Sequence, residues 1–276
     1  MIILLQCADR VGLVADIAKV MADARLNILA MKEYVNVAEN RFFIRLHVDK
    51  TPDVENLKEQ LLRMLPDDTQ IQIAPTEKKK IAVMVTKEYH CLGDILLRNY
   101  FDNLNASVQC VIGNYDNLRA LTEKFNIPFH YISHEEISKE DFEKSVAHVL
   151  SQYECDYIVL AKFMRILSPD FIARYPNQII NIHHSFLPAF IGANPYKQAH
   201  ERGVKIIGAT AHYVTNTLDE GPIISQEIIP VNHGHTVSDM RTLGKEIEKA
   251  VLAKALGLVF QDRVLVHANK TIVFEN

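Results

Sequence analysis

The chain has 276 residues, a formal net charge of -4 and a hydrophobic fraction of 48%. This length suits one large domain or two ordinary ones, and the apolar content is sufficient for their cores. A mildly negative chain is a poor match for the phosphates of nucleic acid, so we expect small-molecule partners and no nucleic-acid partner.

The N-terminal sequence carries no export or membrane signal. Asp9 and Arg10 follow the apolar run 1–5 too soon for a signal-peptide core or a membrane span. The four cysteines are widely spaced and form no CxxC pair, which favours reduced, buried thiols over a disulfide framework. We therefore expect a cytoplasmic protein with no membrane partner.

Hydrophobic periodicity over residues 1–76 predicts a small α/β domain. The expected strands are 2–5, 26–37, 41–48 and 70–73, and the expected helices are 12–24 and one after Pro52. This βαββαβ order is typical of a ferredoxin-like sandwich, with one antiparallel sheet and two helices on one face.

A charged stretch at 75–80 contains one proline, three lysines and no apolar period, as an exposed domain boundary does. A nucleic-acid role for the lysines is the weaker interpretation. We expect one domain at 1–76 and a second at 77–276.

The second domain alternates short apolar runs with helical segments, which predicts a Rossmann-like α/β fold with a mainly parallel sheet. Helix starts are expected at Ser138, at Ser168 before a proline, and at Thr236 before a long amphipathic helix towards Phe260. The expected strands are 81–86, 108–113, 129–133, 157–162, 179–185, 208–214 and 223–231, with a terminal hairpin over 264–274.

A polar cluster, 181–185, follows an apolar run and therefore lies at the carboxyl end of a strand, where open α/β sheets bind ligands. Strand alternation places Asn181 and His183 on one face and His184 on the other. Such a pair can equally satisfy backbone groups at a strand end, so the motif alone does not decide. The loop 187–195, with two prolines and a glycine, can form a pocket wall.

Asp219 lies in a polar turn between two expected strands. An isolated Asp in such a turn usually caps its own backbone. The residue becomes functional if this loop reaches His183.

Metal binding and serine catalysis are not favoured. The chain has 12 histidines, but His183–His184 and His233–His235 lack the HExxH, paired-cysteine or carboxylate spacing of a zinc site. Ser185 lacks the GxSxG elbow of serine hydrolases. We expect no metal.

Two motifs in this domain resemble the formyltransferase superfamily that uses 10-formyltetrahydrofolate. They are Asn181–Pro188 (NIHHSFLP) and Leu218–Pro222 (LDEGP), and residues 208–221 also follow the active-site signature of that superfamily. The segment Met164–Leu167 matches its folate-contacting segment. In the first domain, Asp9–Val14 and Asn27–Ile28 resemble an ACT domain, and this two-domain layout is that of the formyltetrahydrofolate deformylases.

The resemblance implies hydrolysis of 10-formyltetrahydrofolate to formate and tetrahydrofolate, which supplies formate for purine synthesis and balances the one-carbon folate pool. It implies no cofactor, a small amino-acid effector at the first domain, and a homo-oligomer. The implied catalytic residues are Asn181, His183 and Asp219. The implied substrate-binding residues are Met164, Arg165, Ile166, Leu167, His184, Ser185, Thr217, Leu218, Glu220 and Gly221. The implied effector-binding residues are Asp9, Arg10, Val11, Gly12, Leu13 and Asn27.

The nearest alternative is a formyltransferase that passes the formyl group to an amine acceptor. Glycinamide ribonucleotide transformylases have a small-residue phosphate-binding turn where this chain has the bulky stretch 85–94, and a proline where it has His184. Water is therefore the expected acceptor. Whether His184 holds that water stays open, and its place on the opposite strand face favours a supporting role. A degenerate sensor is a further alternative, against which the intact motifs argue.

Overall fold

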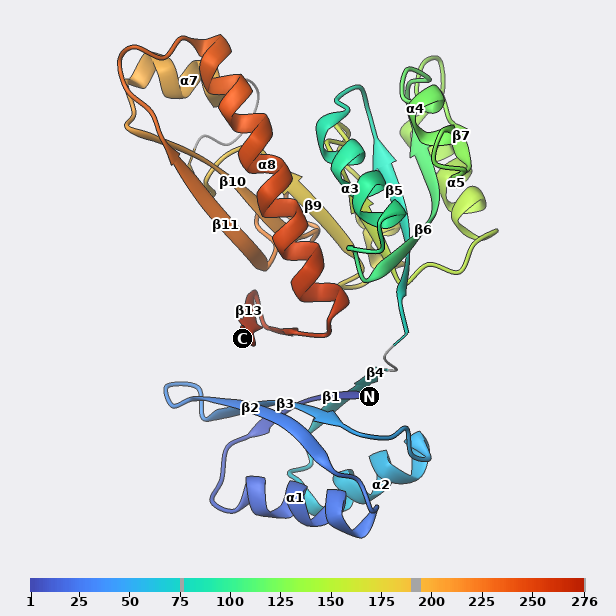
Figure 1. Ribbon diagram of the computed structural model, residues 1–276, viewed down its shortest axis with the longest axis vertical. Coiled ribbons are helices and arrows are strands. Elements are labelled where there is room, and N and C mark those ends of the chain that lie inside the picture. Colours follow the sequence, from blue (N-terminus) through green and yellow to red (C-terminus); the bar gives the residue numbers. More distant parts are fainter. Residues whose placement is uncertain (75–76, 190–194, 276) are drawn as a thin grey trace. The chain divides into compact units, whose positions relative to one another are not determined.

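The computed structural model describes residues 1–74, 77–189 and 195–275 (Figure 1). It divides into two compact units. The first comprises Met1–Glu77, Asp262–Leu265 and Ile272–Asn276, and the second comprises Lys78–Gln261 and Val266–Thr271. The expected boundary at residue 76 stays a prediction, and that residue lies outside the described ones.

The first unit has the expected βαββαβ order. Its elements are β1 (Ile2–Ala8), α1 (Leu13–Asp23), β2 (Ile28–Asn36), β3 (Arg41–Val48), α2 (Val54–Met64) and β4 (Gln70–Ala74). The strands form an antiparallel sheet in the order β2-β3-β1-β4. On α1, Leu13, Ile17 and Val20 recur at helical spacing and pack into one core with alternate residues of β1 and β3. The ferredoxin-like prediction is confirmed.

The second unit contains a seven-stranded sheet. Its strands are β5 (Lys79–Val85), β6 (Ala106–Gly113), β7 (Phe129–Tyr131), β8 (Tyr157–Leu160), β9 (Ile179–His183), β10 (Ile206–Tyr213) and β11 (Ile223–Pro230). The order is β11-β10-β9-β8-β5-β6-β7, and β5 to β9 pair in parallel while β10 is antiparallel to both of its neighbours. The mainly parallel α/β prediction is confirmed.

Helices cover both faces of this sheet. They are α3 (His90–Tyr100), α4 (Arg119–Glu123), α5 (Lys139–Leu150), α6 (Pro169–Ala173), α7 (Pro195–Arg202) and α8 (Val237–Phe260). Ala82 and Met84 of β5 pack in one cluster with α5 and α6, and the alternating Val83 is equally buried, as a strand covered on both sides requires. Figure 1 shows α3 and α8 crossing one face of the sheet, and the two helices contact each other.

The three expected helix starts are confirmed. Ser138, Ser168 and Thr236 each accept a hydrogen bond from a backbone N–H in the first turn, and Thr236 with Asp239 completes a capping box. Several strands end earlier than expected. β8 stops at Leu160, two residues before Lys162, whose φ of 62° cannot continue a strand.

The C-terminal segment forms the expected hairpin, β12 (Val264–His267) and β13 (Lys270–Val273). Within the first unit, Leu265 and Phe274 pack against Ile2, Leu4 and Phe43. Among the described residues, no helix combines the length and apolar character needed to cross a bilayer.

Candidate active site

The polar cluster predicted from sequence lies on two neighbouring antiparallel strands, β9 and β10. Asn181 is directly opposite His212, and His183 is directly opposite Thr210. Residues opposite each other in a sheet point to the same face, as do residues two apart on one strand. The register therefore brings an amide, two imidazoles and a hydroxyl onto one face.

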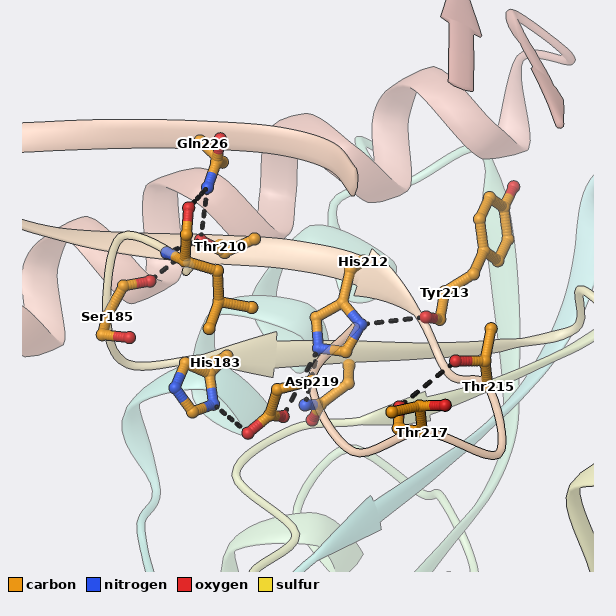
Figure 2. Close-up of polar contacts among 11 residues, drawn as sticks. His183, Ser185, Thr210, His212, Tyr213, Thr215, Thr217, Asp219 and Gln226 are labelled. Carbon is orange, nitrogen blue, oxygen red and sulfur yellow. Dashed lines mark hydrogen bonds and ion pairs between the residues drawn. The ribbon is translucent and has the colours of Figure 1, made fainter. Parts of the chain in front are cut away.

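Asp219 reaches this face from the turn between β10 and β11. Its Oδ2 lies 3.3 Å from His183 Nδ1 and its Oδ1 lies 3.8 Å from His212 Nε2, and Figure 2 shows both rings directed at the carboxylate. The backbone φ of 57° is a left-handed conformation that Asp tolerates better than most residues. The carboxylate thus contacts two histidines, which favours the functional interpretation of Asp219 over simple turn chemistry.

The charge state of Asp219 follows from these contacts. Burial raises the pKa of the carboxyl group, but the hydrogen bond and charge of His183, together with His212, outweigh it and lower the pKa below its ordinary value. Asp219 is therefore ionised at neutral pH.

His212 is a site residue that sequence reasoning missed. Its Nδ1 lies 2.9 Å from the Tyr213 carbonyl oxygen, so Nδ1 carries the proton and Nε2 accepts a hydrogen bond from Asn181 Nδ2 at 3.2 Å. Burial lowers the pKa of His212, which keeps the ring neutral. The imidazole therefore fixes which way the Asn181 amide points. The strand register opposite Asn181 is the signal that could have revealed it.

Two of the predicted substrate-binding residues, Gly221 and Ser185, make contacts that shape the loops around the site. A Cβ on Gly221 would lie 1.8 Å from the Tyr213 carbonyl oxygen, so only glycine allows the close approach that sets the Asp219 turn. The Ser185 carbonyl accepts a hydrogen bond of 2.9 Å from the Thr210 hydroxyl, which also accepts one from the Leu187 N–H at 3.1 Å. These contacts fold the chain back after β9, and Figure 2 shows them beside the histidine pair.

A pocket of about 290 Å³ opens beside the catalytic candidates, a volume close to the lower limit for small-molecule sites. Of the predicted residues, Met164–Leu167, His184, Thr217 and Leu218 line it with Asn181, His183 and Asp219, whereas Ser185, Glu220 and Gly221 do not. The lining residues that sequence reasoning missed are Leu160, Lys162, Phe163, Ile172, Ile182, His212, Val214, Thr215 and Asn216. Residues 190–194 of the loop 187–195, which was expected to form a pocket wall, lie outside the described residues.

Comparison with known proteins identifies the family. A family model described as formyl transferase matches residues 79–256, and one described as ACT domain matches residues 1–65. The formyltetrahydrofolate deformylase of Haemophilus influenzae is 50% identical over 272 residues, which are 99% of this chain and 98% of that protein. The chain belongs to the formyltetrahydrofolate deformylase family.

Solved structures agree with this membership. A crystal structure of a formyltetrahydrofolate deformylase from Pseudomonas syringae pv. tomato has a TM-score of 0.95 at 37% identity and covers 99% of this chain and 94% of that one. A glycinamide ribonucleotide transformylase 1 from Symbiobacterium toebii has a TM-score of 0.68 at 29% identity. It covers 73% of this chain and 96% of the transformylase. The deformylase likeness therefore extends over both units.

Among the described residues of the catalytic unit, one group has metal-ligand spacing. Atoms of His90, Cys91 and Glu248 lie within 4.8 Å of one another. However, His90 Nε2 is hydrogen-bonded to Glu248 at 2.8 Å, and the Lys162 ammonium lies 3.2 Å from the same carboxylate. Burial raises the pKa of the Cys91 thiol, which disfavours the thiolate that a metal needs. The group is better described as a hydrogen-bonded cluster.

The effector residues expected in the ACT unit of this family member are not all close together. Asp9–Gly12 follow the end of β1 that pairs with Arg41, whereas Asn27 precedes the end of β2 that pairs with Val48. These ends are separated by about seven residues of strand, or roughly 20 Å. Leu13 points into the core and is 2% exposed. Within one chain, the exposed residues of the predicted effector site therefore lie in two separate places, the turn Arg10–Gly12 and Asn27.

Proposed function

We propose that this chain hydrolyses 10-formyltetrahydrofolate to formate and tetrahydrofolate, with Asn181, His183 and Asp219 carrying the chemistry. The observation that carries the proposal is the convergence of the Asn181 amide, the His183 ring and the Asp219 carboxylate at one pocket. Membership of the deformylase family and the likeness over both units support it.

Asn181 stabilises the charge that develops in the transition state. As water adds to the formyl carbon, the carbonyl oxygen becomes an oxyanion. One hydrogen of Asn181 Nδ2 is directed at His212, which leaves the other for this oxyanion. A single well-placed donor of this kind contributes about 3 kcal/mol to catalysis.

The His183–Asp219 pair transfers the proton. The new carbon–oxygen bond forms as the water O–H bond breaks, and the proton passes to this pair. The bond from the formyl carbon to N10 of the folate then breaks, and N10 takes up that proton. The products are tetrahydrofolate and formic acid, which ionises to formate. Asp219 also fixes the tautomer and orientation of the His183 ring through Nδ1.

The folate ring system binds between two pocket walls. Met164, Ile166 and Leu218 present apolar side chains that are 59%, 61% and 50% exposed, an arrangement suited to a flat heterocycle. Arg165 and Thr217 line the same pocket. The pterin occupies this pocket and the glutamyl tail extends outward.

The acceptor is tested by supplying 10-formyltetrahydrofolate with no amine present. We expect formate and tetrahydrofolate to appear in equal amounts, measured by a coupled formate dehydrogenase assay and by folate absorbance. Turnover that requires an added amine would establish the transferase alternative instead. In the cell, the released formate supplies purine synthesis and its release balances the one-carbon folate pool.

The first unit binds a small amino acid at the turn Asp9–Gly12 and thereby tunes the catalytic unit within a homo-oligomer. The match to the ACT family supports a small-molecule effector. Val11, 98% exposed, and Gly12, with a φ of 92°, form an accessible turn at the start of α1. Calorimetry with the free amino acids should give a saturable signal for at least one of them. No signal with any would reduce the unit to an assembly module.

A further inference from the structure

Lys162 combines two unfavourable features at the edge of the pocket. Its φ of 62° is left-handed, a conformation that glycine adopts freely and that is unfavourable for most other residues. Its side chain is only 9% exposed, although burial of an ammonium group is itself unfavourable. A lysine at such a position indicates that its charge has a specific use.

That charge belongs to a buried cluster centred on Glu248 of α8, which is 1% exposed. The carboxylate contacts Lys162 Nζ at 3.2 Å, His90 Nε2 at 2.8 Å and the Tyr196 hydroxyl at 2.6 Å. Burial raises the pKa of Glu248, but these three partners outweigh it and lower the pKa to about 2. A Cβ on Gly244 would lie 2.0 Å from the Tyr196 hydroxyl, so the helix is shaped to admit that ring. The cluster is therefore a built feature, with an ionised carboxylate and a cation at its centre.

His184 lies between this cluster and the catalytic pair, and it lines the pocket. Its ring centroid is 5.1 Å from that of His183 and 6.1 Å from that of Tyr196. β9 ends at His183, so the strand alternation that was expected to turn His184 away from the site does not extend to it.

Burial and the positive charges near His184 favour the neutral ring. Burial, the Lys162 ammonium and His183 lower the pKa of His184 to about 4, while Glu248 and Asp219 act in the opposite direction. At neutral pH the imidazole thus keeps one nitrogen with a lone pair. A neutral imidazole accepts a hydrogen bond at that nitrogen, whereas an imidazolium can only donate.

We propose that Lys162 is a positioning residue for the hydrolysis: paired with Glu248, its ammonium keeps His184 an uncharged hydrogen-bond acceptor that holds the attacking water. The inference rests on the proposed function, in which the water contacts the His183–Asp219 pair, and it adds His184 as a second contact of the same water. One hydrogen atom of this water is donated in a hydrogen bond to His184. The other hydrogen passes as a proton to the His183–Asp219 pair as the carbon–oxygen bond forms. His184 itself neither gains nor loses a proton.

The test is the pH dependence of formate release in Lys162→Met, with Lys162→Arg as the matched control that keeps the charge. Removal of the positive neighbour takes away one of the causes that lower the pKa of His184, so this pKa rises, while burial, the largest cause, still holds it below the unperturbed value of about 6.5. The protonated, inactive fraction then grows as pH falls, so the rate of Lys162→Met relative to wild type should drop between pH 8 and pH 5.5, by at most the roughly 10-fold that an unperturbed imidazole would give. The rate of Lys162→Arg relative to wild type should not change over this pH range. A flat ratio for Lys162→Met as well would assign Lys162 a purely structural role and overturn the proposal.

A second pair of variants leaves Lys162 in place, so it tests the proposal even if Lys162→Met does not fold. His184→Gln keeps an acceptor oxygen and should lose less than about 10-fold in kcat, whereas His184→Phe keeps a ring without an acceptor and should lose about 100-fold, as a misplaced reactant does. Equal rates for the two variants would overturn the proposal. A wild-type enzyme that releases no formate at pH 8 without an amine would refute the proposed function instead, so the two failures are distinguishable.

Discussion

Asp219→Asn should lower the kcat of formate release by about 1000-fold, within the range of general acid–base catalysis, and change KM by no more than a few fold. The carboxylate accepts the His183 Nδ1–H, and an asparagine amide can donate to that nitrogen instead. The His183 ring would then hold its proton on the wrong nitrogen, which is how an Asp-to-Asn change disables a His-Asp pair in other enzymes. Steady-state kinetics with 10-formyltetrahydrofolate measures both constants.

Glu220→Gln is the matched control for this prediction. Glu220 carries the same functional group on the same turn, but its side chain is exposed and does not line the pocket. Its kcat should stay within two- to three-fold of wild type. An Asp219→Asn enzyme with wild-type turnover would remove Asp219 from the mechanism, whereas a loss shared by both variants would implicate the turn itself.

The pH dependence of the wild-type enzyme should not reflect the ionisation of Asp219. Its folded-state pKa is lowered below its unperturbed value of about 3.9, so the carboxylate is charged throughout the range from pH 5 to pH 8. The stability that this shift contributes is present above the unfolded pKa and is lost only as pH falls through the folded one. An acid limb within the physiological range therefore belongs to an imidazole.

Local patterns in the sequence predicted most of the fold, because they depend on periodicity and capping. Ser138, Ser168 and Thr236 begin helices as expected, since a side-chain oxygen two or three residues before an N–H is a purely local arrangement. The shared face of Asn181 and His183 followed from strand alternation in the same way.

Residues that depend on long-range contacts were missed. His212 reaches the site because β10 pairs antiparallel with β9 in one register, and nothing near His212 in the sequence encodes that register. Lys162 was missed for a related reason, since its partner Glu248 is 86 residues away on α8. Asn27 and the turn Asp9–Gly12 are likewise separated by a long-range feature, because the α1 crossover returns the chain to the far end of the sheet, and the effector role of Asn27 stays a prediction. Sequence patterns identify candidate groups, and strand register decides which of them meet.

Asn181→Leu should lower kcat by about 100- to 1000-fold, the usual loss on removing a single oxyanion donor. Leucine fills a similar volume and offers no N–H, so the oxyanion loses its donor while the β9–β10 pairing is retained. His212 Nε2 also loses its partner. Because the donor matters most once charge develops on the oxygen, substrate affinity should change far less than kcat.

Asn216→Leu separates this effect from a general loss of polarity in the pocket. Asn216 lines the same pocket with the same amide group, but its side chain is exposed and it lies in the loop after β10 instead of opposite His212. Its replacement should alter KM and leave kcat within a few fold. If the two substitutions lowered kcat equally, stabilisation of the oxyanion would have to be assigned to groups other than Asn181. The separation expected here, a kcat effect at 181 and a KM effect at 216, follows from the one contact that distinguishes them: only the Asn181 amide is held in place by His212.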